Sequence, residues 1–99
     1  MIRKNSKIWS VLANDCETPG EFIRSVMLLR NENSVTLGKK MGTSSSYINM
    51  TTGNQSVPDY KACVNFAKAL DIDPFLLGKV CMDYKIKQTL EKDELQSNK

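Results

Sequence analysis

Histidine is absent from this chain of 99 residues, which excludes histidine general-base catalysis and histidine metal sites. The three cysteines (Cys16, Cys63 and Cys81) are scattered and include no C-x-x-C pair, so neither a disulfide framework nor a zinc site is expected. We expect them to be small buried or half-buried apolar groups. The sequence pairs no nucleophile with a base, and we therefore expect neither an enzyme nor a cofactor.

Long apolar runs are also absent. The longest aliphatic run, Val26 to Leu29, is far shorter than the roughly 20 residues that span a bilayer. The basic residues 1–7 are followed only by Ile8 to Ala13 as an apolar stretch, and Ser10 interrupts it, so no secretory signal is predicted. We expect a cytoplasmic protein with no membrane partner and no small-molecule ligand.

The length predicts one domain with tails, and its composition is that of an ordinary soluble chain, with 25% charged and 40% hydrophobic residues. Fourteen basic residues against eleven acidic residues give a net charge of +3. This charge permits a polyanionic partner but does not require one.

Helical spacing of apolar residues, together with start and stop signals, predicts an all-α fold of five helices. The first helix begins at a capping box, Thr18 to Glu21, and continues to Asn31. The other four are expected at 34–41, 45–52, 58–70 and from Pro74 to about Leu90.

The predicted organisation places the central domain at 18–78, between a lead-in at 1–17 and a C-terminal extension at 79–99. Within the lead-in we expect one amphipathic turn that docks on the domain, formed by Ile8, Trp9, Val11 and Leu12. Residues 91–99 are expected to be a frayed polar tail. Core positions are expected at Tyr60, Phe66, Leu70 and Phe75, because they fall at helical spacing.

The two short helices around Gly42 have the spacing of a helix-turn-helix. This motif needs a first helix across the phosphate backbone, a second helix in the major groove and a tight turn between them. Gly38 lies where the helix crossing requires a small side chain, and Gly42 supplies the turn. Ser44 is the expected cap of the second helix, and Ile48 is its apolar anchor.

Residues 18–77 resemble the DNA-binding domain of phage-repressor and Cro-type regulators, the xenobiotic-response-element family of helix-turn-helix proteins. The strongest match is the segment Pro58 to Ile72, with its Ala-Lys-Ala-Leu ending and the following Asp-Ile. Met41-Gly42-Thr43-Ser44 and Ser46-Tyr47-Ile48 also match. The resemblance implies a compact five-helix, repressor-like domain that binds double-stranded DNA.

The chain departs from the family pattern at several positions. Ser34 stands where a phosphate-gripping glutamine is common, and Gly38 replaces an alanine. The expected recognition helix, residues 45–52, carries no charge, whereas family members often have arginine, lysine or glutamine there. We therefore expect modest sequence specificity from each half-site.

The resemblance places the base-reading positions at Ser45, Ser46, Asn49 and Met50. Phosphate contacts are expected from Ser34, Lys39, Lys40, Ser44, Tyr47, Asn54, Gln55 and Ser56. A basic arm that follows a groove is expected from Arg3, Lys4 and Lys7. The alternatives are a solvated helix face for the lysine pair and an ordinary solvated terminus for the arm.

The last helix has an apolar stripe that exceeds the needs of one small core. A monomer of this type reads few base pairs, so we expect a homodimer that reads two half-sites. The expected interface residues are Leu76, Leu77, Val80 and Tyr84. The alternative is that this stripe packs on the lead-in of its own chain.

The sequence thus predicts a DNA-binding transcriptional regulator that binds its operator as a dimer, a repressor or autoregulator of the phage or mobile-element type. The alternative is a protein-interaction module of the antitoxin, antirepressor or host-inhibitor type. It would keep the helix-turn-helix scaffold without reading DNA, and the uncharged recognition helix motivates it.

Overall fold

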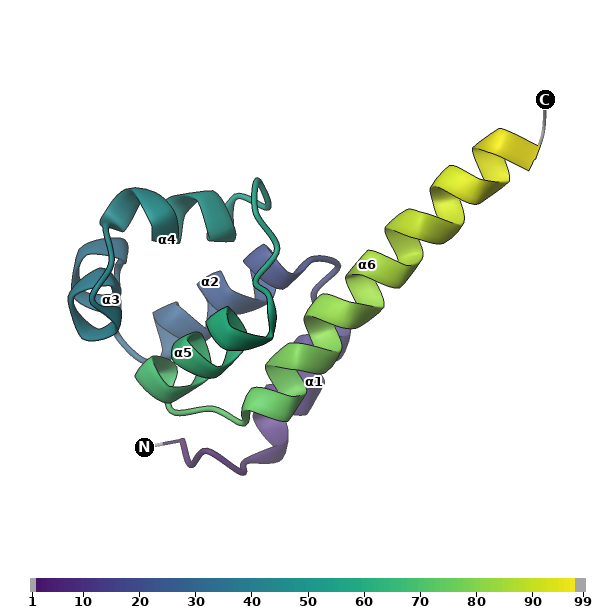
Figure 1. Cartoon of the computed structure of the whole chain (residues 1–99). Coiled ribbons are helices and arrows are strands. Elements are labelled where there is room, and N and C mark those ends of the chain that lie inside the picture. Colours follow the sequence, from purple (N-terminus) through teal and green to yellow (C-terminus); the bar gives the residue numbers. More distant parts are fainter. Residues whose placement is uncertain (1, 98–99) are drawn as a thin grey trace.

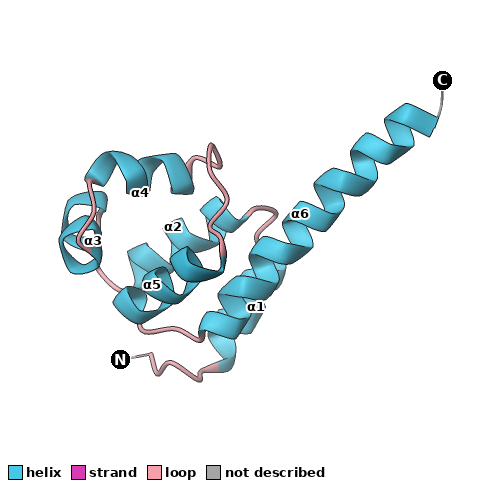
Figure 2. Cartoon of the chain, viewed as in Figure 1, coloured by secondary structure: helices cyan, strands magenta, loops and turns pink. Residues whose placement is uncertain are grey.

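The computed structural model describes residues 2–97, with side-chain surroundings for residues 2–93. Its six helices are α1 (Lys7–Asp15), α2 (Pro19–Leu29), α3 (Ser34–Met41), α4 (Ser45–Thr52), α5 (Tyr60–Leu70) and α6 (Pro74–Ser97). Figure 2 shows these helices joined by short loops, with no strand in residues 2–97. The all-α prediction is confirmed, and the predicted number of helices was one too low.

Capping side chains determine where the helices begin. Thr18 Oγ1 accepts a hydrogen bond from the Glu21 amide at 3.2 Å, and Ser44 Oγ accepts one from the Tyr47 amide at 3.2 Å. Asn33 and Thr36 form the reciprocal capping box. In the box predicted at Thr18, the Glu21 carboxylate instead accepts from the amide of Glu17, one residue earlier.

The core lies between α2, α3, α4 and α5, and α1 and α6 close one side of it (Figure 1). Its side chains are fully buried and mostly aliphatic or aromatic. The largest of them are Trp9, Phe22, Phe66, Ile23, Leu37, Ile48, Leu70, Ile72 and Leu77. Each helix from α1 to α6 contributes at least one of these side chains, so all six share one hydrophobic core.

The lead-in is a full helix rather than a single turn. Trp9 of α1 is 1% exposed, and its Nε1 donates a hydrogen bond to the Arg3 carbonyl at 2.8 Å. The guanidinium of Arg30 lies over the Trp9 ring, 4.7 Å from its centroid. That guanidinium also donates to the carbonyls of Leu70 and Asp71, at 2.9 and 2.6 Å, and to the carbonyl of Ile2. Arg30 therefore joins the N-terminal segment to the turn between α5 and α6.

The last helix continues past Leu90 to Ser97, so the frayed tail predicted for 91–99 is wrong over residues 91–97, and residues 98–99 lie outside the described range. The far half of α6 projects from the rest of the molecule (Figure 1). With α6 included, the molecule measures 50 × 30 × 20 Å. From Lys85 to Asp93 every side chain is exposed.

The stripe predicted to form the dimer interface faces inward. Leu77 is completely buried in the core, which rules it out as a contact between subunits. Leu76, Val80 and Tyr84 are half-buried and line a cleft whose other wall is α1. The alternative, that this stripe packs on the lead-in of its own chain, is the arrangement observed.

Two residues predicted for the core are instead on the surface. Tyr60 is 77% exposed and Phe75 is 86% exposed, whereas Phe66 and Leu70 are buried as predicted. Tyr60 is the first residue of α5, and Phe75 lies two positions before the buried Leu77, on the other side of α6. Both line an open groove between the two helices.

Candidate nucleic-acid interface

A tight turn sets the angle between α3 and α4. Gly42 adopts the left-handed conformation, with φ of +70°, and the Thr43 amide donates to the Gly38 carbonyl at 2.8 Å. A Cβ atom at Gly38 would lie only 2.8 Å from the Thr43 carbonyl oxygen, so the two backbones meet as closely as glycine allows. In Figure 1, α3 is seen nearly end-on while α4 lies across the view, so the two helices cross steeply.

Helix α4 buries one side and presents the other to solvent. Ile48 and Thr51 are 0% and 1% exposed, and the Thr51 hydroxyl is satisfied by the Tyr47 carbonyl at 3.1 Å. Of the predicted base-reading residues, Ser46, Asn49 and Met50 are exposed and Ser45 is half-buried. No described segment covers the outer side of α4 in Figure 1. This surface is therefore free to meet a partner.

Ser34 holds the side chain of Asn49. Its Oγ donates to Asn49 Oδ1 at 2.5 Å and joins the first residue of α3 to the middle of α4. With the amide in this orientation, Asn49 Nδ2 remains available as a donor, and Oδ1 keeps a second lone pair. Ser34, predicted to bind phosphate, thus also positions the one amide of α4.

Tyr47 and Ser44 lie at the N-terminal end of the same surface. The Tyr47 ring stacks on Phe66, with 6.1 Å between centroids, so Tyr47 is half-buried. Ser44 is exposed and serves as the helix cap.

The loop after α4 contains three predicted phosphate contacts, and one of them also holds α4 against α2. Asn54 Oδ1 accepts from the Gly20 amide at 2.9 Å, and its Nδ2 donates to Thr18 Oγ1 at 3.0 Å. Both ends of the Asn54 amide thus fasten the end of α4 to the start of α2, and one N–H of Nδ2 is left for a phosphate. Gln55 is exposed and Ser56 is half-buried, so both remain candidates.

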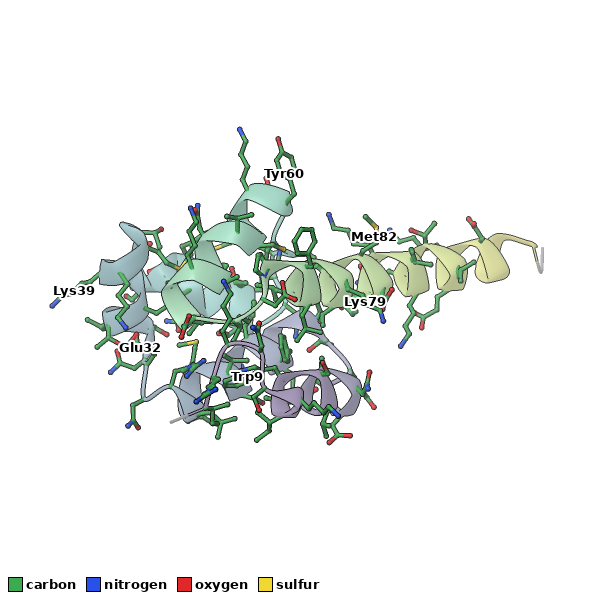
Figure 3. The ribbon with its side chains drawn as sticks, turned by 90° about the horizontal axis from the view of Figure 1, so that it is seen from below. Trp9, Glu32, Lys39, Tyr60, Lys79 and Met82 are labelled. Atoms are coloured by element: carbon green, nitrogen blue, oxygen red, sulfur yellow. The ribbon has the colours of Figure 1, made fainter. Side chains whose placement is uncertain are left out.

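The two lysines of α3 differ in their surroundings. Lys40 Nζ lies 3.2 Å from Glu32 Oε1, which partly offsets its charge. Lys39 is exposed and extends away from the body of the domain (Figure 3), with no carboxylate within ion-pair distance among the described residues. Lys39 is thus the less compensated of the two phosphate candidates.

The predicted basic arm is not an arm. The backbone of Ile2 and Arg3 is held by Arg30 and Trp9, and Lys7 is the first residue of α1. This segment lies on the side of the domain opposite α4 (Figure 1). Arg3, Lys4 and Lys7 are therefore too far from α4 to follow the groove that it would enter, and this prediction is corrected.

Two charged residues missed by the sequence analysis lie beside α4. Arg24 of α2 donates from Nη2 to the Thr52 carbonyl at 3.1 Å, and it lines a hollow together with Glu32, Ser34 and Asn49. The side chain of Glu32 is 9% exposed, and its Oε2 is buried without a hydrogen-bond partner. No motif marks either residue, because only the packing of α2 against α4 brings them to the site.

The three cysteines lie away from this surface. Cys63 and Cys81 are buried, with their sulfur atoms 3.7 Å apart, and Cys16 is half-buried. The hydrogen bond between Cys63 and Cys81 lowers the pKa of Cys63 and, together with burial, raises the pKa of Cys81. Burial raises the pKa of Cys16. Among the described residues, no cluster of His, Cys, Asp and Glu is suited to a metal ion.

Comparisons of this chain with family models, with curated proteins and with solved structures find no match. No helix of residues 2–97 combines the length and apolar character needed to cross a membrane. The functional assignment therefore depends on the geometry of α3, α4 and their neighbours.

If this surface binds nucleic acid, replacing Glu32 by glutamine is expected to tighten binding to random duplex DNA by about two- to fivefold at low salt. The substitution keeps the side-chain volume, removes a negative charge from the hollow beside Ser34 and Asn49, and frees the charge of Lys40. Fluorescence anisotropy with a labelled duplex measures the change. Glu91→Gln makes the same change of net charge far out on α6 and is the control. Equal affinities for the two variants would mean that Glu32 does not face the nucleic acid.

Proposed function

We propose that the protein is a cytoplasmic, sequence-specific DNA-binding transcriptional regulator with a repressor-like helix-turn-helix, a repressor or autoregulator that binds its operator as a homodimer. The observation that carries this proposal is the division of α4 into a buried side and a free side. Ile48 anchors the helix, while Ser46, Asn49 and Met50 point to solvent. A helix exposed in this way, crossed closely by a second helix, has the form that enters a major groove.

The chemistry of the free side suits base edges. The Nδ2 group of Asn49 donates to an acceptor such as adenine N7, and Oδ1 accepts from the adenine amino group. Met50, which is 45% exposed, provides an apolar contact for a thymine methyl group. Ser46 offers a hydroxyl that donates or accepts. Together these groups favour A·T pairs, and the absence of charge in α4 leaves discrimination to a few hydrogen bonds.

Phosphate contacts would come from groups around α4 rather than from α4 itself. Arg24 and Lys39 are exposed cations on α2 and α3, the helices that flank it, and Ser44 and Gln55 are exposed at its two ends. Such contacts fix the orientation of the protein on the duplex without reading sequence. With few cations involved, affinity should fall with salt less steeply than for a lysine-rich reader.

Replacing Asn49 by alanine tests the function directly. The preferred site is first obtained by selection from a random duplex pool, where a palindromic product would indicate two half-sites. We expect the variant to bind that site more weakly by about 1–3 kcal/mol, with affinity for random DNA unchanged. Asn14→Ala removes an exposed amide from α1, on another side of the domain, and is the matched control. Undiminished discrimination in the Asn49 variant would contradict the proposal.

The uncharged surface of α4 also favours a second function, a protein-interaction module that has kept the scaffold. Electrophoretic mobility of random DNA at low salt separates the two. A shift at micromolar protein supports DNA binding, whereas no shift supports the interaction module, because phosphate attraction supplies most of the nonspecific affinity.

A further inference from the structure

A second apolar stripe runs along α6 on the side that faces solvent. Its members are well exposed: Phe75 86%, Met82 58%, Ile86 49% and Leu90 57%. At 3.6 residues per turn these four side chains fall within an arc of about 80°, directly opposite the side that carries Leu77 into the core. We call these four residues the outer stripe.

The outer stripe belongs to a larger apolar surface. At its start, Phe75 and Met82 line a groove with Tyr60 and Val64 of α5, and these are 77% and 38% exposed. Figure 3 shows Tyr60 and Met82 on the same side of the molecule. Contiguous exposed apolar surface of this kind on a small domain marks an interaction site.

The arrangement of α6 is symmetric about Ile86. Met82 and Leu90 lie four residues before and after it, and Lys79 and Asp93 lie seven residues before and after it. The helix itself runs from Pro74 to Ser97, so Ile86 lies next to its midpoint. A helix with this pattern, turned end over end, places apolar residues on apolar residues and Lys79 on Asp93.

We propose that the partner of the outer stripe is a second copy of this chain, with the two α6 helices packed antiparallel about a two-fold axis at Ile86. In this pairing Ile86 meets Ile86, and Met82 meets Leu90. Each Lys79 faces an Asp93, whereas a parallel pairing would set lysine against lysine and aspartate against aspartate. The part of α6 that projects from the domain would then cover Phe75 of the other copy, because Phe75 and Ser97 are equally distant from Ile86.

This pairing deepens the proposed function, since it supplies the dimer that reads two half-sites, and it replaces the inward-facing stripe first expected. It leaves the outer side of α4 free, because α4 lies at another face of the domain from α6 (Figure 1). The contact over the stretch from Lys79 to Asp93 is about 21 Å long.

Sedimentation velocity of the full chain without DNA tests the contact. We expect a dimer in the micromolar range for the native chain and a monomer for Ile86→Glu, which places two like charges on the axis. Ile86 is half-exposed, so the variant should keep its fold, and circular dichroism checks this. Gln88→Glu introduces the same charge on the opposite side of α6 and should remain dimeric. A monomeric native chain, or a dimeric Ile86 variant, would overturn the proposal.

Charge reversal tests the direction of pairing. Lys79→Glu alone sets glutamate against Asp93 twice in the dimer and is expected to raise the dissociation constant about tenfold. The double variant K79E/D93K restores opposite charges and should return to within about twofold of the native value. A double variant that dimerises no more tightly than Lys79→Glu would exclude the antiparallel pairing. Sedimentation without DNA and binding to the selected duplex are separate measurements, so the two proposals can fail separately. A monomer that still discriminates its operator overturns the pairing alone, and a dimer that binds no DNA overturns the DNA-binding function alone.

Discussion

Replacing Trp9 by alanine is expected to lower the free energy of unfolding by about 3–5 kcal/mol, the usual loss for a large buried aromatic side chain. The indole is almost completely buried, and its removal would leave a cavity between α1 and the body of the domain. The substitution also removes the hydrogen bond to the Arg3 carbonyl and the ring beneath Arg30. Because Trp9 is the one tryptophan, the variant has no tryptophan fluorescence to report unfolding. Urea unfolding is therefore followed by circular dichroism at the helical band.

The neighbouring residue provides a matched control. Ile8→Ala, at 41% exposure on the same helix, should change stability by less than about 1 kcal/mol. Trp9→Phe keeps most of the apolar area but loses the Nε1 donor, and it should fall between the two. A loss below about 1 kcal/mol for the alanine variant would show that α1 unfolds independently of the domain.

Replacing Gly20 by alanine should cost about 2–4 kcal/mol of stability and weaken the proposed DNA binding at the same time. A Cβ atom there would lie 2.5 Å from the Thr52 carbonyl oxygen and 2.7 Å from both the Thr51 carbonyl oxygen and Asn54 Oδ1. Two of these atoms are backbone, so the end of α4 must move away from α2. The hydrogen bond from the Gly20 amide to Asn54 is strained by the same movement.

Gly78 of α6 is the control for this substitution. A Cβ atom at Gly78 meets nothing within 4 Å, so Gly78→Ala should raise stability by up to about 1 kcal/mol through helix propensity alone. Thermal unfolding compares the two variants, and anisotropy with the selected duplex reports the effect on α4. If Gly20→Ala proved as stable as Gly78→Ala, the close approach of α2 and α4 would be incorrect.

Local rules were sufficient for the helices that surround the candidate site. Caps at Thr18, Asn33 and Ser44 are side-chain to backbone hydrogen bonds within four residues, so the sequence alone reveals them. The turn at Gly42 and the burial of Ile48 follow from spacing in the same way. The exposure of Ser46, Asn49 and Met50 was predicted with them.

Long-range packing decided what local rules left open. Helix α6 carries apolar residues on two opposite sides, and periodicity does not indicate which side faces the core. The contacts of α6 with α1 and α5 determine which side is buried. Asn54 looked like a free loop amide, but its partners are 34 and 36 residues away. Arg24 is held at the site by its hydrogen bond to the Thr52 carbonyl, 28 residues later in the sequence. None of these partners leaves a signal in the linear sequence.

One guanidinium has a consequence for the dynamics of the whole chain. Arg30 holds the carbonyls of Ile2, Leu70 and Asp71 together and covers Trp9, so detaching the first helix would also remove a restraint from the turn that leads into α6. We therefore expect fluctuations at the beginning of the polypeptide and at the base of its longest helix to be coupled, through Arg30 as well as through the direct packing of α1 on α6.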